Sequence, residues 1–113
     1  MTDPRRADRA QPDPPTLAGF QALLRERYFA TDSARGSAGT FLYFTAEVGE
    51  LATALAANTR EGHTPTPAER ANLQEEFADV LAWLATLANI NEIDLAAAVE
   101  KYTDPGRVEG VKP

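Results

Sequence analysis

The feature that most constrains this chain is a long apolar stretch, residues 37–58, in which only two side chains are charged at neutral pH. Both of them, Glu47 and Glu50, are acidic. Large apolar residues recur through the stretch at spacings of three and four, at Phe41, Phe44, Val48, Leu51 and Leu55. This periodicity predicts a helix that starts between residues 37 and 40, ends at about residue 58 and buries those five residues as its core stripe.

A second apolar helix is predicted at residues 67–89. Thr66, Pro67 and Glu69 form a complete start signal, with a capping threonine, a proline in the first helical position and a capping-box glutamate. Between residues 75 and 91 the only charged side chains are again acidic, namely Glu75, Glu76 and Asp79. Each of the two apolar helices therefore carries acids three residues apart.

The rest of the chain is predicted to be helix and loop, because no segment shows the sustained alternation of a strand. Apolar spacing predicts a first helix at about residues 16–29, followed by a turn at residues 32–36. Residues 59–65 form a polar loop, and Asp94 is placed to cap a short last helix at about residues 94–102. The expected fold class is all-α.

Length and composition indicate one small domain. A chain of 113 residues buries only a modest share of its surface, and much of its 43% hydrophobic content is small alanine. Residues 1–15 are rich in proline and contain no large apolar residue after Met1, so we expect a flexible N-terminal tail and a domain at residues 16–113. The core should be thin, which favours a partner subunit.

Several classes of protein are disfavoured. The absence of cysteine excludes a disulfide framework and a thiolate metal site, and favours a cytoplasmic location. No apolar run reaches the ~18 residues of a membrane span, so no membrane is expected. The net charge of −6 argues against a nucleic-acid partner. The single histidine, His63, lies in a loop, where we expect it to be exposed.

The acidic pairs indicate a metal site. Side chains at positions i and i+3 share one face of a helix, so Glu47 with Glu50, and Glu76 with Asp79, can each converge on one point. Burying an unpaired carboxylate costs on the order of several kcal/mol, and neither apolar stretch supplies a Lys or Arg. Oxygen-only ligands favour a hard cation such as Mg²⁺ or Mn²⁺. Alternatively, the acids are solvated or pair with arginines elsewhere in the fold, such as Arg25, Arg27 and Arg70.

Two segments carry a family resemblance, FLYFTAEVGELA at residues 41–52 and EEFADVL at residues 75–81. They resemble the paired motifs of the MazG-type nucleotide pyrophosphohydrolases, which belong to the all-α NTP pyrophosphohydrolase superfamily. The resemblance covers about residues 16–102 and implies a four-helix MazG-like bundle completed by dimerisation, as a homodimer or homotetramer. It also implies magnesium-dependent hydrolysis of ribo- or deoxyribonucleoside triphosphates to monophosphate and pyrophosphate, with nucleotide-pool housecleaning as a candidate role.

The same resemblance assigns roles to four acids. It implies that Glu47, Glu50, Glu76 and Asp79 bind Mg²⁺, with Mn²⁺ as the alternative metal. It implies further that one of the first two, Glu47 or Glu50, acts as the catalytic base toward water. The family pattern has an additional glutamate where this chain has Ala46. That departure keeps open an alternative function, a non-catalytic helical dimerisation or interaction module with a degenerate metal site.

Given the resemblance, five further residues are candidate contacts to the nucleoside triphosphate. Trp83, one turn beyond the last acid, can stack on a base or pack in the core. Lys101 and Arg107 are candidate phosphate contacts, although a lysine near a helix end also complements the helix dipole. Asn89 and Tyr102 can contact the base or the ribose, and Asn89 can instead end its helix.

Overall fold

The structure is a computed structural model and describes residues 13–107. Its helices are α2 (Leu17–Thr59), α3 (Pro67–Ile90), α4 (Leu95–Ala98) and α5 (Glu100–Thr103). No strand occurs among residues 13–107, which confirms the all-α class. The tail predicted at residues 1–15 falls outside the described residues except for residues 13–15, which are exposed and not helical.

Helix α2 consists of two helical segments that meet at Gly36. The first segment is capped by Thr16, whose hydroxyl accepts a hydrogen bond from the Gly19 N–H at 2.9 Å. Gly36 has φ 79° and ψ 173°, a backbone conformation open almost only to glycine. The chain therefore changes direction at this one residue and then resumes its helix as far as Thr59.

The turn predicted at residues 32–36 is wrong for residues 32–35, which are helical. The physical reason is an ion pair at helical spacing, in which the Arg35 guanidinium donates to Oδ1 of Asp32 at 3.1 Å. The same guanidinium donates across the kink to the Thr40 hydroxyl at 3.1 Å. Oδ1 of Asp32 is thus paired within a helix, and the first segment extends to residue 35 instead of residue 29.

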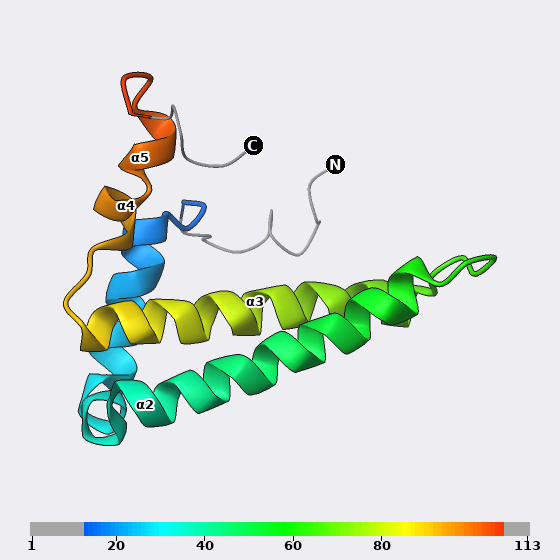
Figure 1. The fold of residues 1–113 in the computed structure, drawn as a ribbon, viewed down its shortest axis with the longest axis horizontal. Coiled ribbons are helices and arrows are strands. Elements are labelled where there is room, and N and C mark those ends of the chain that lie inside the picture. Colours follow the sequence, from blue (N-terminus) through cyan, green and yellow to red (C-terminus); the bar gives the residue numbers. More distant parts are fainter. Residues whose placement is uncertain (1–12, 108–113) are drawn as a thin grey trace.

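Beyond the kink, α2 runs antiparallel to α3 in a long hairpin, and the first segment of α2 crosses the end of the hairpin where α3 stops (Figure 1). Buried amides join the two at this corner. The Asn89 side chain donates to the Gln21 carbonyl at 3.1 Å, and the Gln21 side chain donates to the Ile93 carbonyl at 2.7 Å. Polar side chains therefore fix the angle between the first segment and the hairpin.

The last two helices continue from the same corner. Asp94 caps α4 as predicted, with Oδ1 accepting from the N–H groups of Ala96 and Ala97 at 3.0 and 3.3 Å. The single helix predicted at residues 94–102 is instead two short helices, because the backbone tightens at Val99, where φ is −73° and ψ is −7°. Figure 1 shows α4 and α5 leading away from the hairpin.

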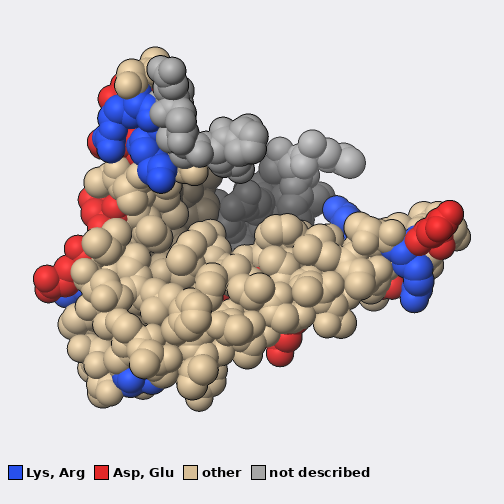
Figure 2. All heavy atoms as spheres, viewed as in Figure 1, with Lys and Arg blue, Asp and Glu red and all other residues tan. Residues whose placement is uncertain are grey.

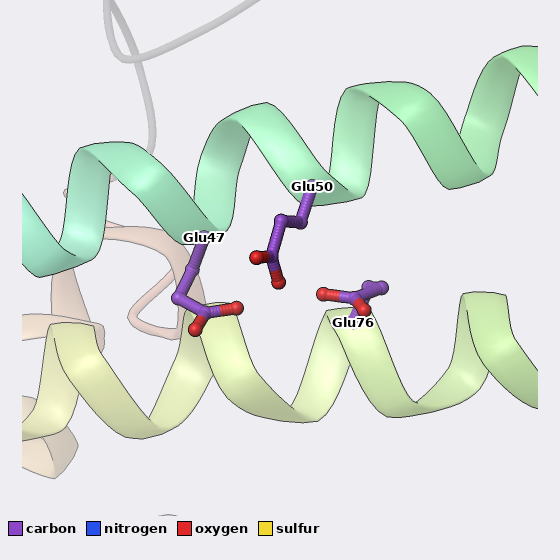
Figure 3. Close-up of side chains that lie close together, drawn as sticks. All are labelled: Glu47, Glu50 and Glu76. Carbon is purple, nitrogen blue, oxygen red and sulfur yellow. The ribbon is translucent and has the colours of Figure 1, made fainter.

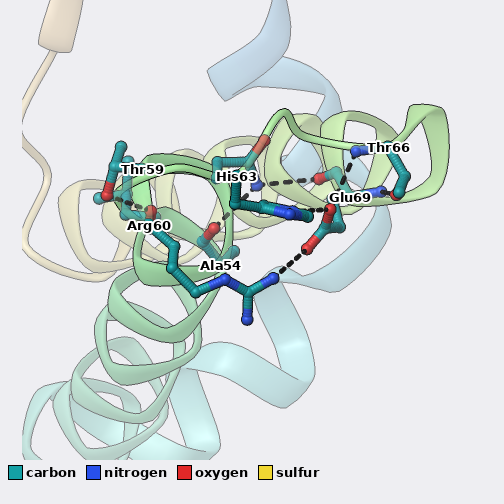
Figure 4. Close-up of polar contacts among 8 residues, drawn as sticks. Ala54, Thr59, Arg60, His63, Thr66 and Glu69 are labelled. Atoms are coloured by element: carbon teal, nitrogen blue, oxygen red, sulfur yellow. Dashed lines mark hydrogen bonds and ion pairs between the residues drawn. The ribbon is translucent and has the colours of Figure 1, made fainter.

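The predicted capping box closes the loop between α2 and α3 (Figure 4). The Thr66 hydroxyl accepts from the Glu69 N–H at 3.1 Å, and the Thr66 N–H donates to the Glu69 carboxylate at 2.9 Å. That backbone bond, followed by the hydrogen bond with His63, lowers the pKa of Glu69. The expectation of an exposed His63 is wrong, because its Nε2 lies 2.7 Å from Oε1 of Glu69 and its ring is partly buried.

The apolar core of residues 13–107 is thin. Its buried apolar residues are mostly small, namely Ala54, Leu73, Ala85 and Ala88. The predicted core stripe is wrong for Phe41, Val48 and Leu55, which are 55%, 41% and 38% exposed. The other two residues of the stripe, Phe44 and Leu51, are partly buried. The reason is geometric: α3 covers one side of α2, and no other described element covers the rest of the hairpin along its length. Charged side chains are sparse on the hairpin surface in Figure 2.

The length and apolarity of the helices can be compared with those of a membrane span. Within residues 13–107 no single helix has the length and apolarity to cross a membrane. The pair Pro67–Ile90 and Leu95–Thr103 meets the same test of length and composition across a 101° bend.

The substitution Gly36→Ala is expected to destabilise the fold by about 1–3 kcal/mol, because a side chain is strained at φ 79°. An added Cβ would meet no atom within 4 Å, so the effect would come from the backbone alone. Denaturant unfolding measures it. The matched control is Gly49→Ala in α2, where an added Cβ also meets nothing within 4 Å. It should be neutral or stabilise by up to about 1 kcal/mol, and equal losses in both variants would contradict the strain.

Candidate metal centre

Helices α2 and α3 present three carboxylates to one another across the hairpin (Figure 3). Glu47 and Glu50 project from α2, and Glu76 projects from α3 to meet them. One oxygen from each residue lies within 4.8 Å of the corresponding oxygens of the other two. The i, i+3 spacing on α2 puts two acids on one helical face, which is the face turned toward α3.

Part of this carboxylate cluster, formed by Glu47, Glu50 and Glu76, is closed off from water. Glu47 and Glu76 are partly buried, and Oε2 of each is buried without a hydrogen-bond partner. Among residues 13–107, none of the three acids forms an ion pair with Lys, Arg or His. Buried carboxylate oxygens without partners are unfavourable, so the cluster requires compensation by a proton or a cation.

The electrostatics of the cluster disfavour its charged form. Burial raises the pKa of Glu47 above its ordinary value of 4.5, and the neighbouring charge of Glu50 raises it further. Burial is also the main cause of the raised pKa of Glu76, followed by the charge of Glu50. A cation placed among these oxygens would lower both pKa values, because it stabilises the carboxylate forms.

The donor set fits a hard divalent cation. All three groups offer carboxylate oxygens and none offers sulfur or nitrogen. The unpartnered Oε2 atoms of Glu47 and Glu76 leave lone pairs available to a metal. Glu50 is exposed, so one side of the cluster is open to water and to a ligand. These residues can therefore hold a metal that still has free coordination positions.

The fourth predicted ligand, Asp79, lies at the edge of the cluster. Its side chain is exposed, and it is not among the three groups whose oxygens lie within 4.8 Å of one another. Its charge nevertheless contributes to the raised pKa of both Glu47 and Glu76, so its carboxylate is close to them. Its role as a metal ligand stays a prediction.

An aromatic pair lies beside the acids, toward the kink. Tyr43 of α2 stacks on Trp83 of α3 with ring centroids 5.0 Å apart and planes inclined by 10°. Tyr43 precedes Glu47 by one turn and Trp83 follows Asp79 by one turn, a rise of about 6 Å along each helix. The Arg35 guanidinium lies 5.1 Å from the Trp83 ring centroid. Trp83 is thus partly buried and stacks on a half-exposed ring, and its contact with a base stays a prediction.

The other candidate substrate contacts lie away from the cluster within one chain. Asn89 is 4% exposed and lies about 20 Å farther along α3 than Glu76. Lys101 and Tyr102 are on α5, which leads away from the hairpin, and Lys101 Nζ lies 5.4 Å from the Tyr102 ring centroid (Figure 1). Arg107 pairs with Glu100 at 3.6 Å. Contact between these residues and a substrate stays a prediction.

Sequence reasoning does not single out Tyr43 of the aromatic pair or its neighbours Asp32 and Arg35. The signals that could have found them are short-range. Asp32 and Arg35 have opposite charges at helical spacing immediately before a glycine. Tyr43 stands one turn before Glu47 on α2, just as Trp83 stands one turn after Asp79 on α3. Because α2 and α3 are antiparallel, Tyr43 and Trp83 lie at the same height along the hairpin.

A family model matches the part of the chain that contains this cluster. Residues 35–104 match the MazG nucleotide pyrophosphohydrolase domain, which is more than half of the 113 residues. The chain therefore belongs to the MazG family of nucleotide pyrophosphohydrolases, whose members are typically metal-dependent. No significant match is found among curated proteins.

The substitution Glu76→Gln is expected to stabilise the metal-free protein increasingly as pH rises. Because the pKa of Glu76 is raised in the folded chain, its contribution to stability is present below 4.5 and is lost as pH rises through the folded pKa. Thermal unfolding in the presence of a chelator, followed from acid to neutral pH for both proteins, measures the difference. The control Glu75→Gln changes the neighbouring acid outside the cluster and should show a smaller pH dependence. A Glu76→Gln variant less stable than the unaltered chain at neutral pH would contradict the prediction.

Proposed function

We propose that this chain is a magnesium-dependent pyrophosphohydrolase that cleaves ribo- or deoxyribonucleoside triphosphates to the monophosphate and pyrophosphate. The observation that carries the proposal is the carboxylate cluster, with two buried oxygens that have no partner, inside the matched family domain. Mg²⁺ is proposed because every donor is a carboxylate oxygen, and Mn²⁺ is the alternative.

The cluster residues have separate tasks in this proposal. Glu47, Glu50 and Glu76 hold the metal, and Asp79 adds a ligand from the edge. When bound, Mg²⁺ supplies positive charge that neutralises the phosphate oxygens and the leaving pyrophosphate. The oxygen of the attacking water bonds to phosphorus while the anhydride bond between the α- and β-phosphates breaks. Glu47 or Glu50 accepts the proton that this water loses.

Turnover tests the proposal directly. With Mg²⁺ and a panel of ribo- and deoxyribonucleoside triphosphates, chromatography should show monophosphate and pyrophosphate. Glu50→Gln and Asp79→Asn are each expected to lower kcat/KM by about a hundredfold or more, because each removes a negatively charged ligand of the metal that neutralises the substrate phosphates. The control Glu75→Gln lies on the same helix outside the cluster and should retain activity.

Other outcomes of this assay would overturn the proposal. Release of orthophosphate would indicate cleavage at a different bond. Full activity in both Glu50→Gln and Asp79→Asn would place the chemistry elsewhere. If no nucleotide is turned over, the non-catalytic helical module that Ala46 keeps open becomes the better account. The family pattern has three acids in this part of α2, and this chain keeps only Glu47 and Glu50, since the third position is the exposed Ala46.

We further propose that the chain works as a homodimer, or as a homotetramer built from such dimers, in which a second copy completes a four-helix bundle. The exposed apolar side chains lie on both long helices and include Leu42 at 72% and Phe77 at 54% exposure. Two packed helices leave half of each apolar surface open, and a second hairpin supplies the missing layer. An uncovered surface of this kind is typical of an interface rather than of a monomer.

The substitution Leu42→Glu is expected to weaken self-association at least about tenfold, because it would bury a charge in the interface. Sedimentation velocity over a range of protein concentrations measures the change. Thr64→Glu introduces the same charge at an exposed position in the loop between α2 and α3 and should leave association unaltered. A monomeric parent chain, or equal association in both variants, would contradict the interface.

A further inference from the structure

A pocket of about 320 Å³ lies beside the aromatic pair, between the first segment of α2 and α3. Its apolar walls include Leu24, Tyr28 and Trp83, and its polar groups include Asp32 and Arg35. This volume falls in the range of small-molecule sites, and the combination of aromatic walls with a few polar groups is typical of sites for planar heterocycles.

One carboxylate oxygen in this pocket has no hydrogen-bond partner. Asp32 is 4% exposed, and Arg35 donates only to its Oδ1, while Oδ2 is buried without any hydrogen bond. A carboxylate oxygen can only accept hydrogen bonds. Leaving a buried acceptor without a donor is unfavourable. A ligand that brings an N–H group would remove this defect.

The pocket is in line with the carboxylate cluster. Trp83 forms one of its walls, and this residue lies one turn beyond Asp79, about 6 Å along α3. A ligand whose phosphates lie at the acids would therefore direct its next group past the aromatic pair toward the pocket. In a nucleotide, the sugar and the base follow the phosphates.

We propose that this pocket binds the nucleobase of the substrate and that Oδ2 of Asp32 accepts a hydrogen bond from an exocyclic amino group. The proposal rests on the proposed function and specifies its substrate class: bases that carry an amino group are preferred over uracil and thymine. Uracil presents a carbonyl oxygen where cytosine has its amino group, and two facing acceptors disfavour binding.

Access to Oδ2 requires a local movement. The oxygen is closed off from water by the side chains around it, so an amino group reaches it after a wall side chain turns aside. Tyr28 lines the pocket and is 50% exposed, so its ring has room to rotate.

Nucleoside binding tests the proposal without metal and without turnover. Trp83 is the only tryptophan of the chain, so intrinsic fluorescence reports on the pocket wall. The full chain is titrated with deoxycytidine and with deoxyuridine in the presence of a chelator. We expect deoxycytidine to bind at least tenfold more tightly. Equal affinity, preference for deoxyuridine, or no binding of either nucleoside would overturn the proposal.

A variant tests the role of Asp32 itself. Asp32→Asn keeps the size of the side chain but adds an N–H donor that can bond the uracil carbonyl, so the preference should fall to about one. Asp104→Asn makes the same change at an exposed site after α5 and should keep the tenfold preference. A preference that survives in Asp32→Asn would overturn the assignment.

If Asp32→Asn does not fold, the unaltered chain still decides the question. The ¹³C chemical shift of the Asp32 carboxyl carbon should change with deoxycytidine and not with deoxyuridine, and an equal response to both would overturn the proposal. The two proposals fail separately. Selective nucleoside binding with no hydrolysis refutes only the proposed function, whereas hydrolysis with no selectivity refutes only the pocket.

Discussion

Repulsion among carboxylates held between two helices is the constraint on which the rest of the structure depends. Glu47, Glu50 and Glu76 meet at the middle of the hairpin, where the described residues supply no cation to pair with them. The hairpin is instead secured at its two ends. The Thr66–Glu69 capping box closes one end, and the buried amides of the corner close the other. The middle therefore needs a proton or a cation to offset the repulsion, and the stability of the hairpin comes from its two ends.

The features that the sequence predicts correctly depend on residues close together in the chain. The capping box at the start of α3 and the cap of α4 by Asp94 each involve side chains within three residues of the atoms they bond. Glu47 and Glu50 share one face of α2 because of helical periodicity alone. Local rules of this kind need no knowledge of how the helices pack, and for that reason they hold.

The features that the sequence does not predict depend on tertiary structure. An i, i+3 ion pair keeps Asp32 and Arg35 helical and reduces the expected turn to Gly36. The apolar stripe of α2 has the correct spacing, but spacing does not say which chain covers it, and within one chain Phe41 remains exposed. Asn89 resembles a helix end or a ligand contact in the sequence. In the fold its amide is used to fix the first segment of α2.

The kink at Gly36 also sets a length scale. Asp32 lies just before the kink, Glu47 and Glu50 follow it, and a hydrogen bond from Arg35 to Thr40 spans the bend. The separation of the pocket from the carboxylate cluster is thus determined by rigid helices and not by a loop that could adjust. In the proposed substrate complex, this fixed separation would select ligands by the distance between their ring and their phosphates as well as by the identity of either end.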